Sequence, residues 1–274
     1  MFPDKNNYKT PRWTIARKPI LAGTIALSAM LASGTLGYAQ ETKDTSALFP
    51  LKTEEQTKAF EEAVKEYLLK NPEVIIDSLT RYQELQAQRE EEQKQHAIVS
   101  NVEELHNSPT SPYIGNPDGD VVLVEFFDYR CPYCHKAASI VEQLVEDDPN
   151  LKVVMKEFPI LSPESMIAAR AALAAMKQGK YNEYHFALMD NASDLSQARL
   201  FDLAEELDLD LDRFKEDMKS PEIGQEILNT RTLAQKIGAN GTPAFVVGTT
   251  SVPPNTTYEQ FKALIESIRA EKAS

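Results

Sequence analysis

The feature that most constrains the fold is an apolar segment followed directly by two cysteines three residues apart. Residues 121–129 read Val-Val-Leu-Val-Glu-Phe-Phe-Asp-Tyr, which is typical of a buried strand. After Arg130 come Cys131-Pro132-Tyr133-Cys134, and residues 136–145 have the pattern of a helix. The sequence therefore predicts a strand that ends at a cysteine pair on the first turn of a helix.

This spacing is suited to reversible disulfide chemistry. Cysteines at positions i and i+3 of a helical turn can form a disulfide without movement of the backbone. Pro132 fits the first helical position, where its missing N–H costs nothing. We expect Cys131 to lie at the helix N-terminus, where free N–H groups and the helix dipole favour a thiolate. Cys134 should be more buried and able to resolve a mixed disulfide.

The alternative interpretation of the pair is half of a zinc site. Such a site needs two further ligands, and structural zinc sites normally have a second paired ligand set. The chain has no other cysteine and offers four histidines as imidazole ligands: His96, His106, His135 and His185. The redox interpretation is favoured, and the sequence predicts no metal and no organic cofactor.

The first 39 residues have the three parts of a signal peptide. Five Lys or Arg residues precede an apolar segment at 20–32, and Gly37-Tyr-Ala39 supplies a small-residue site, with cleavage expected after Ala39. An uncleaved anchor is the alternative, but the short apolar core favours cleavage. Export into an oxidising compartment makes a lone cysteine pair a better candidate for a reagent than for a structural bridge.

The charge of the chain excludes some partners. The 274 residues carry a net charge of −13. An acidic protein is repelled by phosphate backbones and anionic lipid surfaces, so no nucleic-acid partner is expected. The length allows one ordinary domain with attachments, or two small domains.

A helical arm is predicted at residues 53–107, after a flexible polar segment at 40–52. Thr53-Glu-Glu-Gln56 fits a capping box, and a second helix is predicted from Pro72 to about Asn107. Apolar residues at 75, 79 and 82 form one seam, and apolar spacing returns at 98, 102 and 105 after the polar stretch 86–95. The two seams are out of register, so a simple coiled coil is excluded. The arm is either a solvated linker or a self-association element. Self-association is suggested because residues 60–82 are too apolar to stay exposed.

Residues 108–274 have the pattern of an α/β domain. A short edge strand at 113–114 precedes the strand with the cysteines, and residues 152–158 form the next strand. This βαβ unit puts the cysteines at the carboxyl end of a strand, where open α/β sheets bind their ligands. Residues 163–237 are helical in pattern, 244–247 and 250–252 read as a hairpin, and 258–271 as a closing helix.

A second motif lies far from the cysteines. Thr242-Pro243 stands directly before an apolar strand, and from the spacing alone a trans proline at a turn is expected. Together with Glu125-Phe-Phe-Asp-Tyr-Arg and the Cys-Pro-Tyr-Cys motif, Gly241-Thr-Pro-Ala-Phe245 resembles the DsbA-like branch of the thioredoxin fold over about residues 112–272. The resemblance implies a thioredoxin-like fold with a helical insertion at about 163–237, preceded by the helical arm.

The resemblance also implies roles for individual residues. Pro243 should be cis and face the cysteines, while the backbone of Thr242 should bind an extended substrate peptide. Glu125 matches a buried acid that accepts a proton from Cys134; the alternative is an ordinary exposed strand charge. Pro132 and Tyr133 should tune the redox properties of the cysteine pair. His135 either stabilises the thiolate or is simply a solvated helix residue.

The N-terminal region resembles a subgroup. The first helix and the Asn71-Pro-Glu-Val74 break look like ScsC-type and related surface-antigen proteins of Gram-negative bacteria. This implies a periplasmic homo-oligomer, commonly a trimer, with surface or outer-membrane association left open. Its partners would be protein substrates with cysteines and a redox partner protein of unknown identity. Thr before the proline is usual in isomerase-type relatives.

Three functions follow from these patterns. The first is an exported disulfide isomerase or reductase that acts on protein disulfides. The second is a monomeric DsbA-type disulfide oxidase. The third is a surface antigen or chaperone-like protein whose redox pair is incidental.

Overall fold

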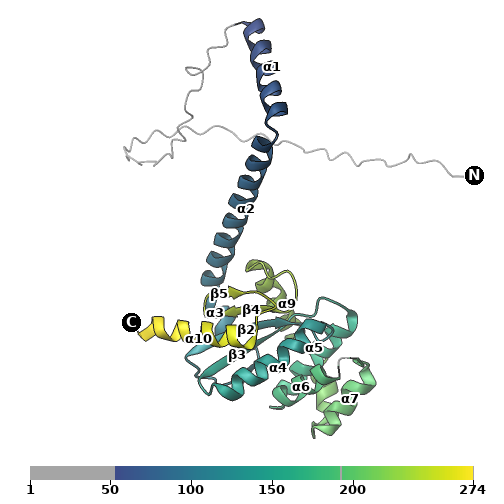
Figure 1. Ribbon diagram of the computed structural model, residues 1–274. Helices are drawn as coiled ribbons and strands as arrows, with labels where there is room; N and C mark the ends of the chain where they lie inside the picture. The colour runs from purple at the N-terminus through teal and green to yellow at the C-terminus, as the bar shows by residue number, and fades with distance from the viewer. Residues whose placement is uncertain (1–52, 192, 274) are drawn as a thin grey trace, which may run out of the picture. The chain divides into compact units, whose positions relative to one another are not determined.

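The computed structural model describes residues 53–191 and 193–273 (Figure 1). The predicted signal peptide and the predicted flexible segment at 40–52 lie outside these residues. The chain divides into two units, residues 1–67 and 68–274, and helix α1 (Glu54–Lys70) spans the boundary between them. In the described residues, no helix has the length and apolar character needed to cross a membrane.

The N-terminal helices begin as predicted but end differently. The Thr53 N–H donates to Oε1 of Gln56, and the Gln56 N–H donates to Oγ1 of Thr53, both at 3.2 Å, so the capping box is confirmed. The prediction of one helix to Asn107 is wrong. Helix α2 (Glu73–Ser100) ends at Ser100, Asn101 is its C-cap residue, and α3 (Val102–His106) follows. The Asn101 side chain donates to the carbonyl of Ala97 at 2.7 Å and competes with the helical hydrogen bonds there.

A five-stranded mixed sheet forms the centre of the second unit. Its strands are β1 (Tyr113–Gly115), β2 (Val121–Phe127), β3 (Leu151–Glu157), β4 (Ala244–Val247) and β5 (Thr250–Val252). The order is β1-β3-β2-β4-β5, with β2 and β3 parallel and the other pairs antiparallel. Helix α4 (Pro132–Asp147) connects β2 to β3, so the predicted βαβ unit and hairpin are confirmed.

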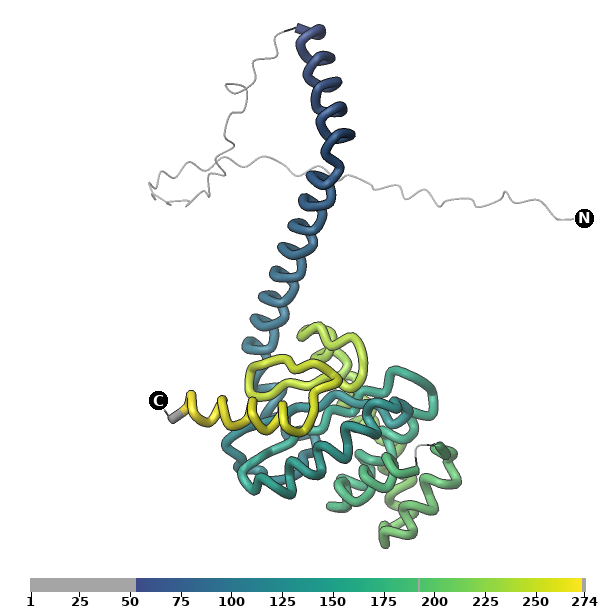
Figure 2. The backbone as a smooth tube through the Cα atoms, in the orientation of Figure 1, coloured from purple at the N-terminus to yellow at the C-terminus, as the bar shows by residue number. Residues whose placement is uncertain are grey.

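Both faces of the sheet are covered, which is why β2 and β3 read as nearly continuous apolar runs. Leu123 and Phe127 face the larger core, which includes residues of α4, the helical insertion and α10 (Tyr258–Ala273). Val124 and Phe126 face a smaller core on the opposite side. Figure 2 shows the backbone of these layers in the orientation of Figure 1.

Part of the predicted arm belongs to this smaller core. Ile98 of α2 and Leu105 of α3 are fully buried there. The Gln95 side chain donates to the carbonyl of Thr249 at 3.0 Å, and Nε2 of His106 lies 2.8 Å from the carbonyl of Gly248, to which it must donate. The end of α2 and α3 therefore hold the turn between β4 and β5, and the folded core begins before residue 108.

The helical insertion lies between β3 and β4 as predicted. It consists of α5 (Pro163–Met176), α6 (Tyr181–Asp190), α7 (Gln197–Glu206), α8 (Leu211–Asp217) and α9 (Pro221–Lys236). Four of these helices begin with a side chain that accepts a backbone N–H three residues later: Ser162, Ser196, Asp210 and Ser220.

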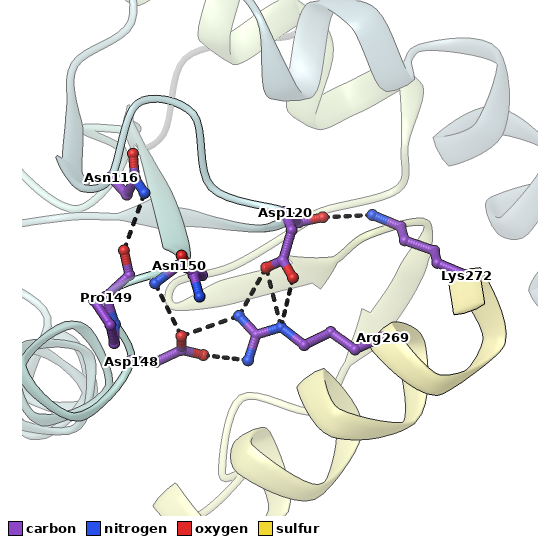
Figure 3. A network of polar contacts seen from close by, with 7 residues as sticks. All are labelled: Asn116, Asp120, Asp148, Pro149, Asn150, Arg269 and Lys272. Atoms are coloured by element: carbon purple, nitrogen blue, oxygen red, sulfur yellow. Dashed lines mark hydrogen bonds and ion pairs between the residues drawn. The ribbon is translucent and has the colours of Figure 1, made fainter.

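Helix α10 is attached by ion pairs and hydrogen bonds to the loop before β2 and to the loop after α4. Arg269 of α10 lies between two carboxylates, with Nη2 2.7 Å from Oδ1 of Asp120 and Nη1 2.7 Å from Oδ2 of Asp148 (Figure 3). Lys272 donates to the carbonyl of Asp120. These contacts join α10 to the residue before β2 and to the end of α4.

Candidate active site

The two cysteines lie at the start of α4, as the sequence predicts. Cys131 is the N-cap residue in an extended conformation, and Pro132 occupies the first turn. The N–H of Cys134 donates to the carbonyl of Cys131 at 3.0 Å. Both are free thiols, with Cys131 4% exposed and Cys134 fully buried. Cys131 is thus the more exposed of the two residues, although both are buried.

The second motif faces the outer thiol. The Thr242–Pro243 peptide bond is cis, as the resemblance implies and against the expectation from spacing alone. Sγ of Cys131 donates to the carbonyl of Thr242 at 3.2 Å, although 111 residues separate them. The backbone carbonyl of the residue two positions before β4 therefore lies beside the thiol.

Glu125 is buried in the middle of β2 on the same sheet face as the cysteines. It is 1% exposed, and its Oε1 atom has no hydrogen-bond partner among the described residues. Burial raises the pKa of Glu125 to about 8. Burial, followed by the charge of Glu125, raises the pKa of Cys134 far above its usual value. The alternative of an exposed strand charge is wrong, and the role of Glu125 as a proton acceptor stays a prediction.

His135 and Tyr133 take different positions around the pair. The His135 ring is half-buried, with Nε2 2.7 Å from the carbonyl of Tyr129. It is therefore held against the loop before Cys131 rather than freely solvated, and its effect on the thiolate stays a prediction. Tyr133 is 68% exposed, and the Lys136 ammonium lies 5.8 Å from its ring centroid.

Asp128 supports the site and was missed by the sequence analysis. Its buried carboxylate accepts the backbone N–H groups of Arg130 at 2.8 Å, Ile160 at 2.8 Å and Leu161 at 2.9 Å. Its own carbonyl accepts the N–H of Cys131 at 2.9 Å. An Asp directly after an apolar strand is typical of a turn, and this was the available signal.

A buried polar cluster, also missed, lies beside this loop. The hydroxyls of Tyr129 and Tyr181 both donate to Oε1 of Glu157 at 2.9 Å. The Tyr129 oxygen also lies 3.0 Å from Nδ1 of His185, which must donate because the tyrosine proton is already used. Burial raises the pKa of Glu157 well above its ordinary value and lowers the pKa of His185 to about 3. The sequence offered only an unexplained Glu at the end of a predicted strand.

Two protein families match the chain. Residues 122–266, more than half of it, match the DSBA-like thioredoxin domain, and residues 56–89 match the copper resistance protein ScsC N-terminal domain. Among curated proteins, the Na(+)/H(+) antiporter NhaA 1 of Salinispora arenicola is 35% identical over 142 residues, which are 51% of this chain and 22% of that protein. The chain spans about a fifth of the length of the first curated relatives that it matches.

Solved structures are similar over most of their own length. A thioredoxin-like oxidoreductase from Silicibacter pomeroyi DSS-3 is 45% identical with a TM-score of 0.59, over 63% of this chain and 98% of that chain. Proteus mirabilis ScsC in a transitional conformation is 28% identical with a TM-score of 0.60, over 80% and 99%. The predicted thioredoxin-like fold with N-terminal helices is confirmed. A cysteine pair at the start of α4, a cis-proline facing it and these matches together show that the chain belongs to the DsbA-like thioredoxin-domain family of thiol–disulfide oxidoreductases, with N-terminal helices of the ScsC type.

Proposed function

We propose that the protein is an exported, periplasmic disulfide isomerase or reductase for protein substrates that contain cysteines. The observation that carries the proposal is the 3.2 Å contact between Sγ of Cys131 and the carbonyl of Thr242. It brings the proposed nucleophile next to the backbone of Thr242, to which an extended client peptide would bind. The chemistry needs no metal and no organic cofactor.

The reaction begins when the Cys131 thiolate attacks one sulfur of a client disulfide. A mixed disulfide forms, and the second client sulfur leaves as a thiolate. In isomerisation, a client thiolate displaces Cys131. In reduction, Cys134 gives its proton to Glu125 and its thiolate attacks Sγ of Cys131. The Cys131–Cys134 disulfide forms, the client thiolate leaves, and two electrons have passed to the client. A separate redox partner protein would then reduce the pair.

Exposed apolar residues on α2 favour an isomerase that works as a homo-oligomer. Ile75, Leu79 and Tyr82 recur at spacings of four and three, and each is exposed in the second unit. They lie within the segment that matches the ScsC N-terminal domain. We propose that this seam joins copies of the chain, commonly three. A monomeric oxidase is the second candidate, and a chaperone-like surface protein with an incidental cysteine pair is the third.

The Cys131→Ser variant tests the redox role. We expect it to lose all activity on a scrambled disulfide protein. Full activity in that variant would contradict every function based on the cysteine pair and would favour the chaperone-like alternative.

A second variant separates the isomerase from the oxidase. Removal of the whole arm would also remove Ile98 and Leu105 from the core, so a point change is the sharper tool. Leu79→Glu should convert the assembly of residues 40–274 to monomers in light scattering and lower isomerase activity while oxidation of a reduced client persists. Thr80→Glu, at the neighbouring exposed position, is the matched control. Undiminished isomerase activity in a monomeric Leu79→Glu variant would contradict the proposal that isomerase activity depends on oligomerisation.

A further inference from the structure

A cavity lies beside the backbone that faces the reactive thiol. Its volume is about 240 Å³, and its lining includes Thr242 and Pro243. The carbonyl of Thr242 is 3.2 Å from Sγ of Cys131. An apolar cavity of about 150 Å³ is large enough to bind benzene. This cavity therefore has room for the side chain of a leucine or a phenylalanine.

The walls of the cavity are largely apolar. Ile98 of α2, Phe126 of β2 and Val246 of β4 line it, and each is at most 2% exposed. Consecutive residues of β4 and of β5 also line the cavity, so these two strands form one wall. Among the described residues of the lining, only Lys94 carries a charge. Such walls suit an uncharged apolar side chain, and the lysine repels a cationic one.

One wall of the cavity comes from the end of α2. Lys94 and Ile98 lie between the two segments that match protein families, residues 56–89 and 122–266. The packing of α2 on the sheet therefore adds this wall to the DsbA-like domain. The cavity has to be argued from the residues of this chain, because the family matches do not include all of its walls.

The cavity and the cysteines lie on opposite faces of the sheet. Phe126 and Val246 pack in the smaller core, whereas Cys131 and Cys134 pack in the larger core. Successive side chains of an extended peptide point in opposite directions. When the cysteine of an extended client points to Cys131, the side chains on either side of that cysteine therefore point to the face with the cavity.

The distances allow a flanking residue to reach the cavity. The Cα atoms of two disulfide-bonded cysteines are about 4.4–6.8 Å apart, and consecutive Cα atoms of a peptide are about 3.8 Å apart. Thr242 has its carbonyl beside Sγ of Cys131 and also lines the cavity. A client bound to the backbone of Thr242 therefore runs beside the cavity within one residue of its cysteine.

We propose that the cavity bounded by Ile98, Phe126 and Val246 is a specificity pocket, which binds an apolar side chain directly before or after the reactive cysteine of a client. A side chain of the size of leucine or phenylalanine fits it, and Lys94 disfavours lysine and arginine at that position. The inference rests on the proposed function, because it names the class of client sequence that the same site prefers.

The test uses short peptides whose single cysteine is disulfide-bonded to 2-nitro-5-thiobenzoate. The Cys131 thiolate attacks the peptide sulfur, a disulfide between Cys131 and the peptide forms, and nitrothiobenzoate leaves as a coloured thiolate. The leaving group is thus the same for every peptide. Leucine, phenylalanine, alanine or lysine is placed next to the cysteine or two positions away. The rate of each peptide with dithiothreitol corrects for its intrinsic reactivity.

We expect a preference at the positions next to the cysteine. Peptides with leucine or phenylalanine there should react about tenfold faster than the alanine peptide, because the side chain is buried in an apolar pocket. The lysine peptide should react more slowly than the alanine peptide. The same residues two positions away from the cysteine should have little effect.

Ser251→Leu fills the cavity from one wall. Ser251 lines the cavity and pairs with Val246, so the two side chains point to the same face of the sheet. The preference for leucine over alanine should fall below about twofold in this variant. Thr250→Leu is the matched control, because Thr250 is exposed and its side chain points to the other face of β5. This control should keep the preference of the wild type.

Lys94→Glu tests the pocket without adding bulk, which guards against misfolding of Ser251→Leu. The rate of the lysine peptide relative to the alanine peptide should rise about threefold, because a repulsive charge becomes an attractive one. Arg89→Glu, at an exposed position of the same helix, is the matched control and should leave this ratio as it is in the wild type.

Three results would overturn the inference. They are equal rates for the leucine and alanine peptides with the wild type, a preference that persists in Ser251→Leu, and a preference only at the positions two residues from the cysteine. A Ser251→Leu variant that changes the mass of the assembly in light scattering but keeps the peptide preference would assign the cavity to a second copy of the chain. The proposed function would still stand in each case, because Cys131→Ser tests it separately.

Discussion

The carboxylate of Asp128 accepts the backbone N–H of Leu161 at 2.9 Å, across 33 residues of sequence. The same carboxylate holds Ile160 and Arg130, so one buried side chain joins the loop before Cys131 to the loop after β3. The side chains of Ile160 and Leu161 are exposed. Asp128 thus fixes the loop that leads to Cys131 against the loop that follows β3.

Asp128→Asn should destabilise the protein. An amide presents only one acceptor atom, so at least one of the three N–H groups loses its partner. A buried donor without a partner costs about 1–3 kcal/mol, and we expect a fall of about 2 kcal/mol in the free energy of unfolding, measured by urea denaturation. Asp118→Asn, in the exposed turn before β2, should change it little. Equal stability of the two variants would show that the Asp128 contacts contribute nothing.

Glu125 should make stability depend on pH. Its pKa in the folded protein, about 8, lies above the ordinary value of 4.5, so the folded state binds its proton more tightly than the unfolded state. The contribution to stability is complete below about pH 4.5 and is lost as the pH rises through about 8. Under reducing conditions, the loss of unfolding free energy between pH 5 and pH 8 should be smaller in Glu125→Gln, by about 3 kcal/mol. An identical loss in both proteins would contradict the raised pKa of Glu125.

Ile98→Ala should show that the end of α2 belongs to the core. Ile98 is fully buried, and removal of a buried Ile side chain costs about 2–5 kcal/mol. We expect a lower midpoint in urea unfolding with an unchanged denaturant slope. Ile76 lies on the exposed surface of the same helix. When Ile76→Ala is added to the monomeric Leu79→Glu variant, the urea midpoint should stay unchanged within error. If Ile98→Ala behaves like Ile76→Ala, the packing of α2 on the sheet is wrong.

Arg269→Lys should weaken the attachment of α10. The guanidinium contacts Asp120 and Asp148 together, and a lysine ammonium cannot reproduce this planar arrangement. The pair is partly solvent-exposed, so the expected cost is only about 1 kcal/mol. Hydrogen exchange in the last turns of α10 should accelerate, and the difference from wild type should shrink in about 1 M salt. Unaltered exchange at low salt would rule out the attachment.

Local sequence patterns predicted most strands of the sheet and the position of the cysteine pair between a strand and a helix. Residues 244–247 and 250–252 were predicted as the strands that the structure contains, because alternation and turn residues act over short distances. The orientation of Glu125 also follows from its apolar neighbours. What failed depends on partners far away in sequence. Ile98 and Leu105 lie in the segment predicted as an arm, whereas they pack in one core with Phe126 and Val246 from strands of the sheet.

The polar network could not be predicted for the same reason. The carboxyl of Glu157 accepts hydrogen bonds from Tyr129 and Tyr181, which only the packing of α6 on the sheet brings together. The break at Asn101 depends on one side-chain hydrogen bond to Ala97, which a helix propensity scale does not distinguish from a solvated asparagine. Sequence patterns therefore predicted that the cysteines lie at the start of a helix, but not the buried polar groups that surround them.

The placement of both cysteines on one helical turn has a consequence for how the chain itself folds. The protein has only these two cysteines, so a single chain can form one intramolecular disulfide and has no competing pairing. That disulfide closes a loop with only Pro132 and Tyr133 between its ends, which restricts the unfolded chain little. Such a chain cannot be trapped during folding by an incorrect intramolecular disulfide of its own.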